Sequence, residues 1–188
     1  MTEVQPFRAI IYNTDRVKGD EVVSPPYDVI SEELKENLYA RSPFNIVRID
    51  FGKVYNTDND LENRYTRAKN YLDEWLTKGI LKETSTEAYY LYEVKYRKDN
   101  KDISMKGIFG RVRLTELCKG VYPHEATHSK PKADRLNLMK YCKANLSPIF
   151  SIYRSQKRDH HKVFDKYLKK PRPIYLHWIW TVSDIVCG

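Results

Sequence analysis

The sequence has few cysteines and no long apolar run, and these two absences exclude several classes of protein. Its 188 residues include three cysteines, an odd number at wide spacing (Cys118, Cys142 and Cys187). Such usage is typical of reduced thiols rather than of a disulfide framework. No apolar stretch reaches the roughly 18 residues that a membrane-spanning helix needs, and the segment Met1 to Arg16 lacks the pattern of a signal peptide. We therefore predict a soluble cytoplasmic protein.

The residues that are present are those of a globular domain. Apolar residues make up 41% of the chain, charged residues 31% and aromatic residues 13%. A chain of this length fits one domain of about 100–200 residues and can bury a core without disulfide bonds. The composition therefore argues against global disorder.

Charge is unevenly distributed along the chain. Residues 1–118 carry 19 Lys and Arg against 20 Asp and Glu, so this part is almost neutral. Residues 119–143 carry six basic against two acidic side chains, and residues 154–172 carry eight against two. The formal net charge of +8 thus belongs to the last third, which would attract an anionic partner such as a phosphate group or a nucleic acid.

Apolar periodicity predicts strands that alternate with helices. Ser31 suits the N-cap of a helix that runs to about Ala40, and Gly79 suits the residue that follows a longer amphipathic helix. The expected elements are strands at 7–12, 45–51, 88–96, 103–114 and 147–154, and helices at 31–40, 60–78, from Pro131 and at 159–170. They predict an α/β domain of the mixed α+β kind, in which helices flank a mixed sheet with a β-hairpin. In the helix from Pro131, the side chains expected to face inward are Leu136, Met139 and Cys142.

The end of the chain differs in composition from the rest. We assign residues 1–170 to an amino-terminal α/β domain and residues 171–188 to an atypical apolar tail, which contains two of the three tryptophans. This tail is either a closing strand or the product of a truncated or frame-shifted gene. In the second case the domain is incomplete.

One segment, His124 to Arg135, concentrates groups that could carry chemistry. The imidazole of His124 can transfer a proton near neutral pH, and Glu125 can orient it. Lys130, Lys132 and Arg135 supply positive charge close to a helix start, where free N–H groups favour anions. Such groups suit phosphate binding or phosphoryl transfer, which depends on positioning and charge stabilisation. The alternative is a solvated loop with capping and salt bridges around Arg135.

The same segment matches the zinc-peptidase pattern H-E-x-x-H at His124, Glu125 and His128. In that pattern one helical face presents both imidazoles to the metal. Here Pro123 and Pro131 flank the motif, and the stretch between them is about two turns long and has no apolar face. No third ligand is evident, so we predict no metal site and keep a zinc hydrolase as an alternative hypothesis.

The basic helix expected at 159–170 suggests another alternative, a non-enzymatic nucleic-acid-binding or assembly module. Basic faces bind phosphates without sequence specificity. No helix-turn-helix, zinc-finger or RNA-recognition signature accompanies this helix, so a charged face that keeps the domain soluble is also consistent with it.

Several segments together resemble the domain of unknown function 1015 family. The segments are Phe7–Ala9, Pro25–Ser31, Asn45–Arg48, His124–Arg135 and Lys143–Phe150, and the resemblance covers about residues 6–154. Their spacing makes the resemblance far more specific than a five-residue motif. In that family the position of His128 is usually apolar, which removes the second zinc ligand.

The resemblance implies a longer, kinase-like or nucleotide-binding protein. Members of the family are about twice this length, and their second half carries an Asp-Gly-His-His-Arg-like motif. That motif is similar to one in ParB/sulfiredoxin-like proteins, which include nucleotide-dependent free-serine kinases. The present chain lacks it, since Asp159-His160-His161-Lys162 contains no glycine. The resemblance therefore implies that the chain is the amino-terminal part of such a protein.

Our main hypothesis is a protein that binds a nucleotide with magnesium, or another phosphorylated small molecule. The proposed site has two proton-transfer residues and six residues that hold phosphate or line its pocket. The first group is His124 and Glu125, and the second is Lys130, Lys132, Asp134, Arg135, Asn145 and Ser147. Within it, Asp134 is expected to fix Arg135. The hypothesis requires His124, Lys132 and Arg135 to converge on one cavity.

Overall fold

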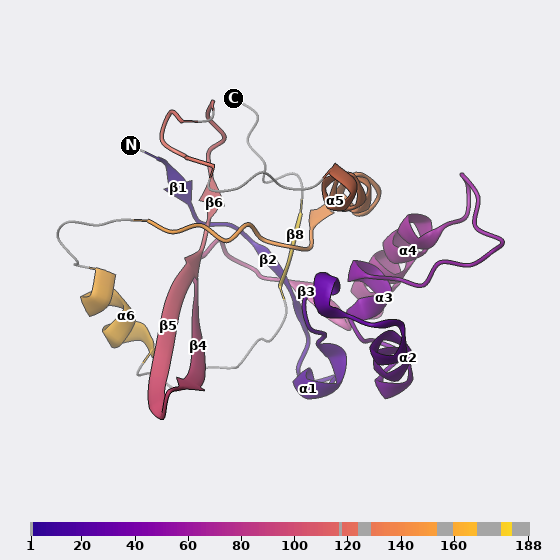
Figure 1. Cartoon of the computed structure of the whole chain (residues 1–188), viewed down its shortest axis with the longest axis horizontal. Helices are drawn as coiled ribbons and strands as arrows, with labels where there is room; N and C mark the ends of the chain where they lie inside the picture. The colour runs from indigo at the N-terminus through magenta and orange to yellow at the C-terminus, as the bar shows by residue number, and fades with distance from the viewer. Residues whose placement is uncertain (1, 117, 124–128, 154–159, 169–177, 182–188) are drawn as a thin grey trace.

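The structure, a computed structural model, describes residues 2–116, 118–123, 129–153, 160–168 and 178–181. These residues form an α+β fold, as predicted. Helices gather on one side of a small central sheet, and a long β-hairpin extends from the other side (Figure 1). Within the described ranges no helix is long and apolar enough to span a bilayer.

The central sheet runs in the order β3 (Leu81–Glu83), β2 (Ala9–Tyr12), β8 (Trp178–Thr181) and β7 (Ala144–Asn145). Every pair of neighbours is antiparallel. All residues of β2 are buried, because the strand lies between two others and its apolar side chains face the core on both sides. The segment 178–181 near the end of the chain thus supplies one strand of this sheet.

Two helices begin at the caps that their sequences encode. In α2 (Glu32–Arg41) the Ser31 hydroxyl accepts a hydrogen bond from the Leu34 amide at 3.1 Å, as predicted. Helix α4 (Arg64–Thr77) begins later than expected, because Asn63 forms a capping box with Thr66 and the preceding residues form a turn. Gly79 follows α4 with a φ of +65°, a left-handed conformation that glycine adopts without strain.

The strand predicted at residues 45–51 is wrong: this segment contains the short helix α3 (Val47–Asp50). The fully buried Asn45 explains the difference, because its side-chain oxygen accepts the Val47 amide at 3.1 Å while its amide donates to the Glu21 and Val23 carbonyls. Ile46, Val47 and Ile49 are all buried, so their pattern reflects burial on several sides rather than the two faces of a strand. Two other short elements, α1 (Gly19–Val22) and the 3₁₀ turn η1 (Tyr27–Val29), were not predicted.

Trp75 of α4 lies at the centre of the largest core cluster. It is 1% exposed, and its ring lies within 6.3 Å of the rings of Tyr12, Phe44 and Tyr71. The core also contains residues from β2, α3 and the later helix α5, so it joins both halves of the sequence.

Helix α5 (Ser129–Cys142) packs against α4, and Pro131 lies in its first turn, as predicted. Its inward face matches the expected one in part: Cys142 is buried, as predicted, and Met139 is partly buried, but Leu138 is buried in place of Leu136, which is half exposed. The sequence pattern placed the rest of the inward face of α5 incorrectly. Near the start of the helix this face consists of the charged residues Asp134 and Arg135, which a search for apolar residues does not find.

The predicted hairpin is formed by β4 (Tyr90–Lys98) and β5 (Lys101–Phe109), which pair along their whole length. Asp99 and Asn100 connect them with φ angles of 50° and 57°, as a tight two-residue turn requires. At its base β1 (Val4–Gln5) pairs with β6 (Arg111–Val112). Helix α6 (His160–Leu168), within the basic helix predicted at 159–170, lies beside the hairpin (Figure 1), where Asp165 contacts Lys106 at 3.1 Å.

The strand predicted at 147–154 is wrong over its described part. Residues 148–153 have no regular secondary structure, and β7 lies earlier, at 144–145. Pro148 lacks the N–H that a strand would use for pairing. Ile149 and Ile152 are each 89% exposed, so neither packs into the core.

Candidate functional site

The structure describes only part of the predicted site. His124 and Glu125, and His128 of the zinc pattern, lie outside the described residues. Lys130 is in the first turn of α5, and Lys132 follows it as an exposed side chain. The other four predicted residues are Asp134 and Arg135 in α5, Asn145 in β7 and Ser147 just after it.

Arg135 is the residue that joins these segments. Its Nη1 donates to Asp50 Oδ1 at 2.6 Å and to Ser147 Oγ at 3.4 Å, and its Nη2 donates to the Asp50 carbonyl at 2.8 Å. Its Nε and Nη2 donate to Asp134 Oδ2 at 3.1 and 2.7 Å. These five contacts equal the five N–H groups of a guanidinium, so each donor of Arg135 has a partner within the chain.

Asp134 is paired with Arg135, its neighbour in the sequence, and it also binds a second arginine. Its Oδ1 forms an ion pair with Nη2 of Arg64, the first residue of α4. The same oxygen accepts a hydrogen bond from the Tyr65 hydroxyl at 2.7 Å. Two guanidinium groups and a phenol from separate helices therefore meet on one carboxylate.

Aromatic rings hold both arginines in place. The Arg135 guanidinium lies 4.1 Å from the centre of the Tyr27 ring, and the Arg64 guanidinium lies 4.9 Å from that of Tyr65 and 5.7 Å from that of Phe51. Arginine binds ring faces through their negative quadrupole. Tyr27 belongs to one of the segments that carry the family resemblance, so three of those segments, at 25–31, 124–135 and 143–150, meet around Arg135.

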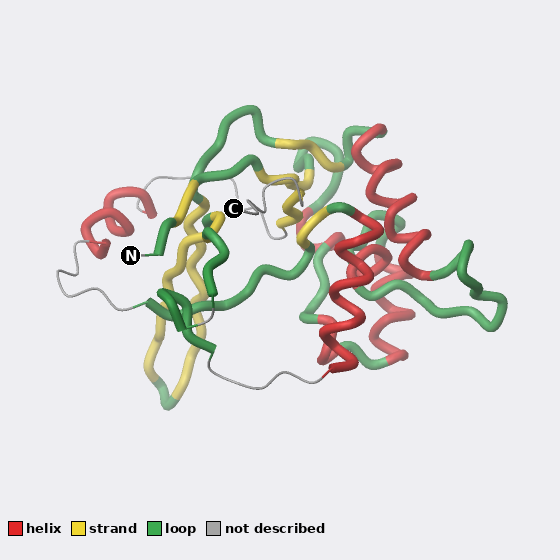
Figure 2. The backbone as a smooth tube through the Cα atoms, turned by 90° about the horizontal axis from the view of Figure 1, so that it is seen from above, coloured by secondary structure: helices red, strands yellow, loops and turns green. Residues whose placement is uncertain are grey.

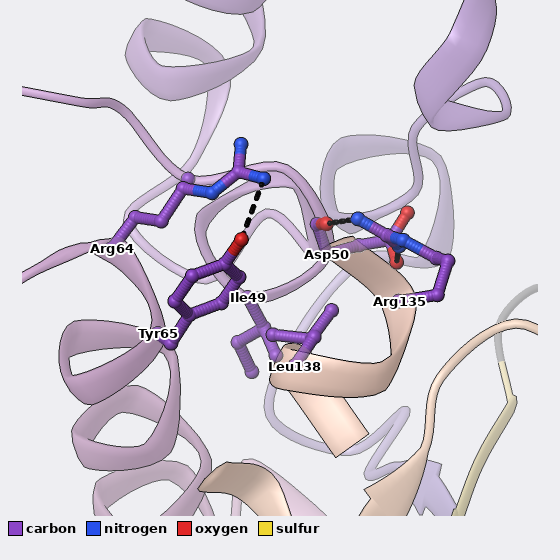
Figure 3. A pocket seen from close by; sticks show the side chains of 7 residues that line it. Ile49, Asp50, Arg64, Tyr65, Arg135 and Leu138 are labelled. Atoms are coloured by element: carbon purple, nitrogen blue, oxygen red, sulfur yellow. Dashed lines mark hydrogen bonds and ion pairs between the residues drawn. The ribbon is translucent and has the colours of Figure 1, made fainter. Parts of the chain in front are cut away.

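A shallow surface depression lies between α3, α4 and α5 at this point, and the side chains that line it leave no room for a water molecule. Figure 3 shows Arg64 and Tyr65 on one side of it and Asp50 and Arg135 on the other, with Ile49 and Leu138 below. The residues that line it are Ile49, Asp50, Gly52, Arg64, Tyr65, Arg135 and Leu138. Figure 2 shows the same group of helices from above, well separated from the hairpin.

The cluster is balanced in charge, and its polar groups are largely removed from solvent. The side chains of Arg135, Arg64, Asp134 and Asp50 are 17%, 20%, 15% and 9% exposed. Two guanidinium groups face two carboxylates, so the cluster alone has no excess positive charge. Such charges interact more strongly at this depth than in water, because the local dielectric constant is lower. Any net attraction for an anion must come from the basic side chains around the cluster, of which Lys132 is the nearest along α5.

The cluster joins the N–H donors of two arginines to two carboxylates. Among the described residues, no group of three His, Cys, Asp or Glu side chains is placed to hold a metal ion. Cys142, on the inward face of α5, is no nucleophile candidate, since burial raises the pKa of its thiol to about 12.

Sequence reasoning missed Asp50, Arg64 and Tyr65. The Tyr65 ring packs against the core, and only its hydroxyl reaches the site. Asp50 lay in the segment taken for a strand, and Arg64 follows a helix cap. None of the three belongs to a local sequence motif. Each contacts a site residue that lies 69 or more positions away in the sequence, so a local pattern cannot reveal it.

The comparisons with known proteins give one match. The family model described as "Protein of unknown function (DUF1015)" matches residues 4–178. No curated protein and no solved structure matches the chain. The family match includes every residue of the cluster.

Proposed function

We propose that this chain, which belongs to the DUF1015 family, binds a phosphate group of a nucleotide or of another phosphorylated small molecule beside the start of α5. The observation that carries the proposal is the convergence of Arg64 and Arg135, from two helices, on a single carboxylate at the edge of a surface depression. Guanidinium groups bind phosphate and carboxylate oxygens with the same paired geometry.

The surroundings of the cluster favour an anion as the ligand. Lys132 is exposed two residues before Asp134, and α5 directs the positive end of its dipole towards this side. The cluster itself is neutral, so these groups supply the excess positive charge. A phosphate at this edge would meet Arg64 and Arg135, which both line the depression.

The remaining predicted residues complete the proposal. Lys130 would add a second ammonium group, Ser147 would hold Arg135 and Asn145 would line the site from β7. His124 and Glu125 would carry any proton transfer. A nucleotide with magnesium is the ligand that the kinase-like hypothesis favours for the longer proteins of the family.

Thermal unfolding with and without ligand tests this function. ATP with magnesium, and inorganic phosphate alone, should each raise the midpoint temperature of unfolding. A ligand at 100 times its Kd adds about 2.7 kcal/mol to the free energy of unfolding. The variants Lys132→Gln and Arg64→Gln should lose most of the shift. Lys140→Gln, an exposed lysine in the last turn of the same helix, is the matched control and should keep it.

The outcome that contradicts the proposal is equally definite. If neither ligand stabilises the wild-type protein, or if Lys140→Gln weakens the effect as much as Lys132→Gln, the site does not bind phosphate as described.

A further inference from the structure

We propose that Asp134 occupies the position of the ligand's phosphate, and that binding displaces its carboxylate from Arg64 and Arg135. The inference rests on the proposed function, because it says how that site accepts an anion. The difficulty it resolves is that every N–H group of Arg135 already has a partner within the chain.

The donors around Asp134 are those that a phosphate group would use. Arg64 Nη2 and the Tyr65 hydroxyl contact one carboxylate oxygen, and Arg135 Nε and Nη2 contact the other. Two oxygens of a phosphate group have a similar spacing to the two oxygens of a carboxylate, so one could accept from Arg64 and the other from Arg135, as the oxygens of Asp134 do. The donors that would bind a phosphate are therefore already in place, and the carboxylate of Asp134 occupies the position between them.

The two carboxylates of the cluster have different roles. Asp50 holds Arg135 through both its side chain, at 2.6 Å, and its backbone carbonyl, at 2.8 Å, and it also contacts Ser147. These contacts, together with the Tyr27 ring at 4.1 Å, keep Arg135 in place without Asp134. We infer that Asp50 keeps its contacts with Arg135 when a ligand binds, whereas the carboxylate of Asp134 is the group that the ligand replaces.

Arg64 also stays oriented when Asp134 leaves. Its guanidinium lies over the rings of Phe51 and Tyr65, and its Nη2 donates to the Tyr65 hydroxyl at 3.3 Å. Departure of the carboxylate would leave two positively charged guanidinium groups and one negatively charged carboxylate, that of Asp50. The anion site would then carry one net positive charge. A negatively charged phosphate would restore the balance.

Removal of the carboxylate charge should therefore increase phosphate affinity. The variant Asp134→Asn keeps the shape of the side chain but loses its charge, and Asp134→Ser removes most of the side chain as well. We expect each to bind inorganic phosphate at least ten times more tightly than the wild-type protein, measured by calorimetric titration. The same substitution at the other carboxylate, Asp50→Asn, is the matched control and should weaken binding, because it loosens Arg135.

A structural role alone predicts a different result. If Asp134 only fixes Arg135, then Asp134→Asn and Asp134→Ser will bind phosphate no more tightly than the wild type. That outcome, in variants whose circular dichroism shows the native fold, overturns the inference. Two variants at the position keep the test valid if one of them fails to fold.

The results also separate this inference from the proposed function. Phosphate binding by the wild type with no gain in the Asp134 variants leaves the function standing and removes the displacement. If only the variants bind phosphate, the donors around Asp134 can bind an anion, but the wild-type chain does not have the proposed function. No binding by any of them contradicts both.

Discussion

The helical side of the described molecule and its β4–β5 hairpin are stabilised in different ways. On the helical side Trp75 is 1% exposed, and ion pairs join separate elements, such as Arg135 of α5 with Asp50 of α3. On the hairpin Tyr96 is 47% exposed, and most of its ion pairs are local, as between Arg97 and Asp102 on facing strands, although Lys106 also pairs with Asp165 of α6. The helical side is therefore organised by tertiary contacts, and the hairpin mainly by its own cross-strand pairs.

This difference indicates where a precise site can form. A binding site needs side chains held by several neighbours, and the cluster around Arg135 has them from α3, α4, α5 and the Tyr27 turn. The hairpin has the exposed tyrosines and lysines of a surface but no comparable support. We therefore expect substitutions of the same kind to have unequal effects on the two sides.

The largest expected contrast is between two aromatic side chains. Trp75→Ala should lower the free energy of unfolding by about 3–5 kcal/mol, because it leaves a cavity in the largest core cluster. Tyr96→Ala, on the hairpin, should cost less than about 1 kcal/mol, in the range of a cross-strand pair. Denaturation with urea measures both. Equal losses would mean that the hairpin is as tightly packed as the core.

The next contrast concerns charges. Arg135→Met should cost about 3 kcal/mol, the lower end of the range for breaking a buried ion pair, because it leaves Asp50 and Asp134 without their main partner. Arg97→Met should cost under about 1 kcal/mol, since its pair with Asp102 is exposed to solvent. If the Arg135 variant is as stable as the wild type, the cluster does not hold α5 in place.

A smaller effect tests the packing of the hairpin itself. A Cβ atom at Gly107 would lie 1.9 Å from an atom of the Tyr92 ring, which covers it from the facing strand. Gly107→Ala should displace that ring and cost about 1–2 kcal/mol by overpacking. Faster amide hydrogen exchange in β4 and β5, with unchanged exchange in α4, is the expected signature. Exchange that rises in α4 as well would show that the hairpin is coupled to the core.

The last effect depends on pH. Burial raises the pKa of the Cys142 thiol to about 12, whereas an unfolded cysteine ionises near about 8.5. Stability from this group is therefore complete below about pH 8.5 and falls as the pH rises towards 12, by roughly 1–2 kcal/mol at about pH 10. The variant Cys142→Ala should lose this part of the pH dependence. Substitution of Cys118, which is exposed, should leave it unchanged.

Local signals allowed much of the fold to be predicted from the sequence. The Ser31 cap, the Gly79 conformation, the hairpin and the position of Pro131 in α5 all depend on residues close together in the chain. Helix α3 could not be predicted in this way, because Asn45 reaches its partners 22 and 24 residues away. Without those contacts its apolar residues resemble a strand.

The candidate site was predictable only in part, for the same physical reason. The pairing of Asp134 with Arg135 follows from their adjacency in the sequence. The contribution of Arg64 and Tyr65 depends on the packing of α4 against α5, and that of Asp50 on a contact across 85 residues. These partners occupy every N–H group of Arg135, so under our proposal a phosphate must displace Asp134 to reach it.

The most direct test of the account is to observe the arginine side chains while phosphate is added. Nuclear magnetic resonance of the Nε–H groups of Arg64 and Arg135 reports on each guanidinium separately. We predict that inorganic phosphate, raised through the millimolar range, shifts both resonances together and leaves that of the hairpin residue Arg97 unchanged. Resonances of Arg64 and Arg135 that stay constant, or that move no more than that of Arg97, would contradict a phosphate site at this cluster.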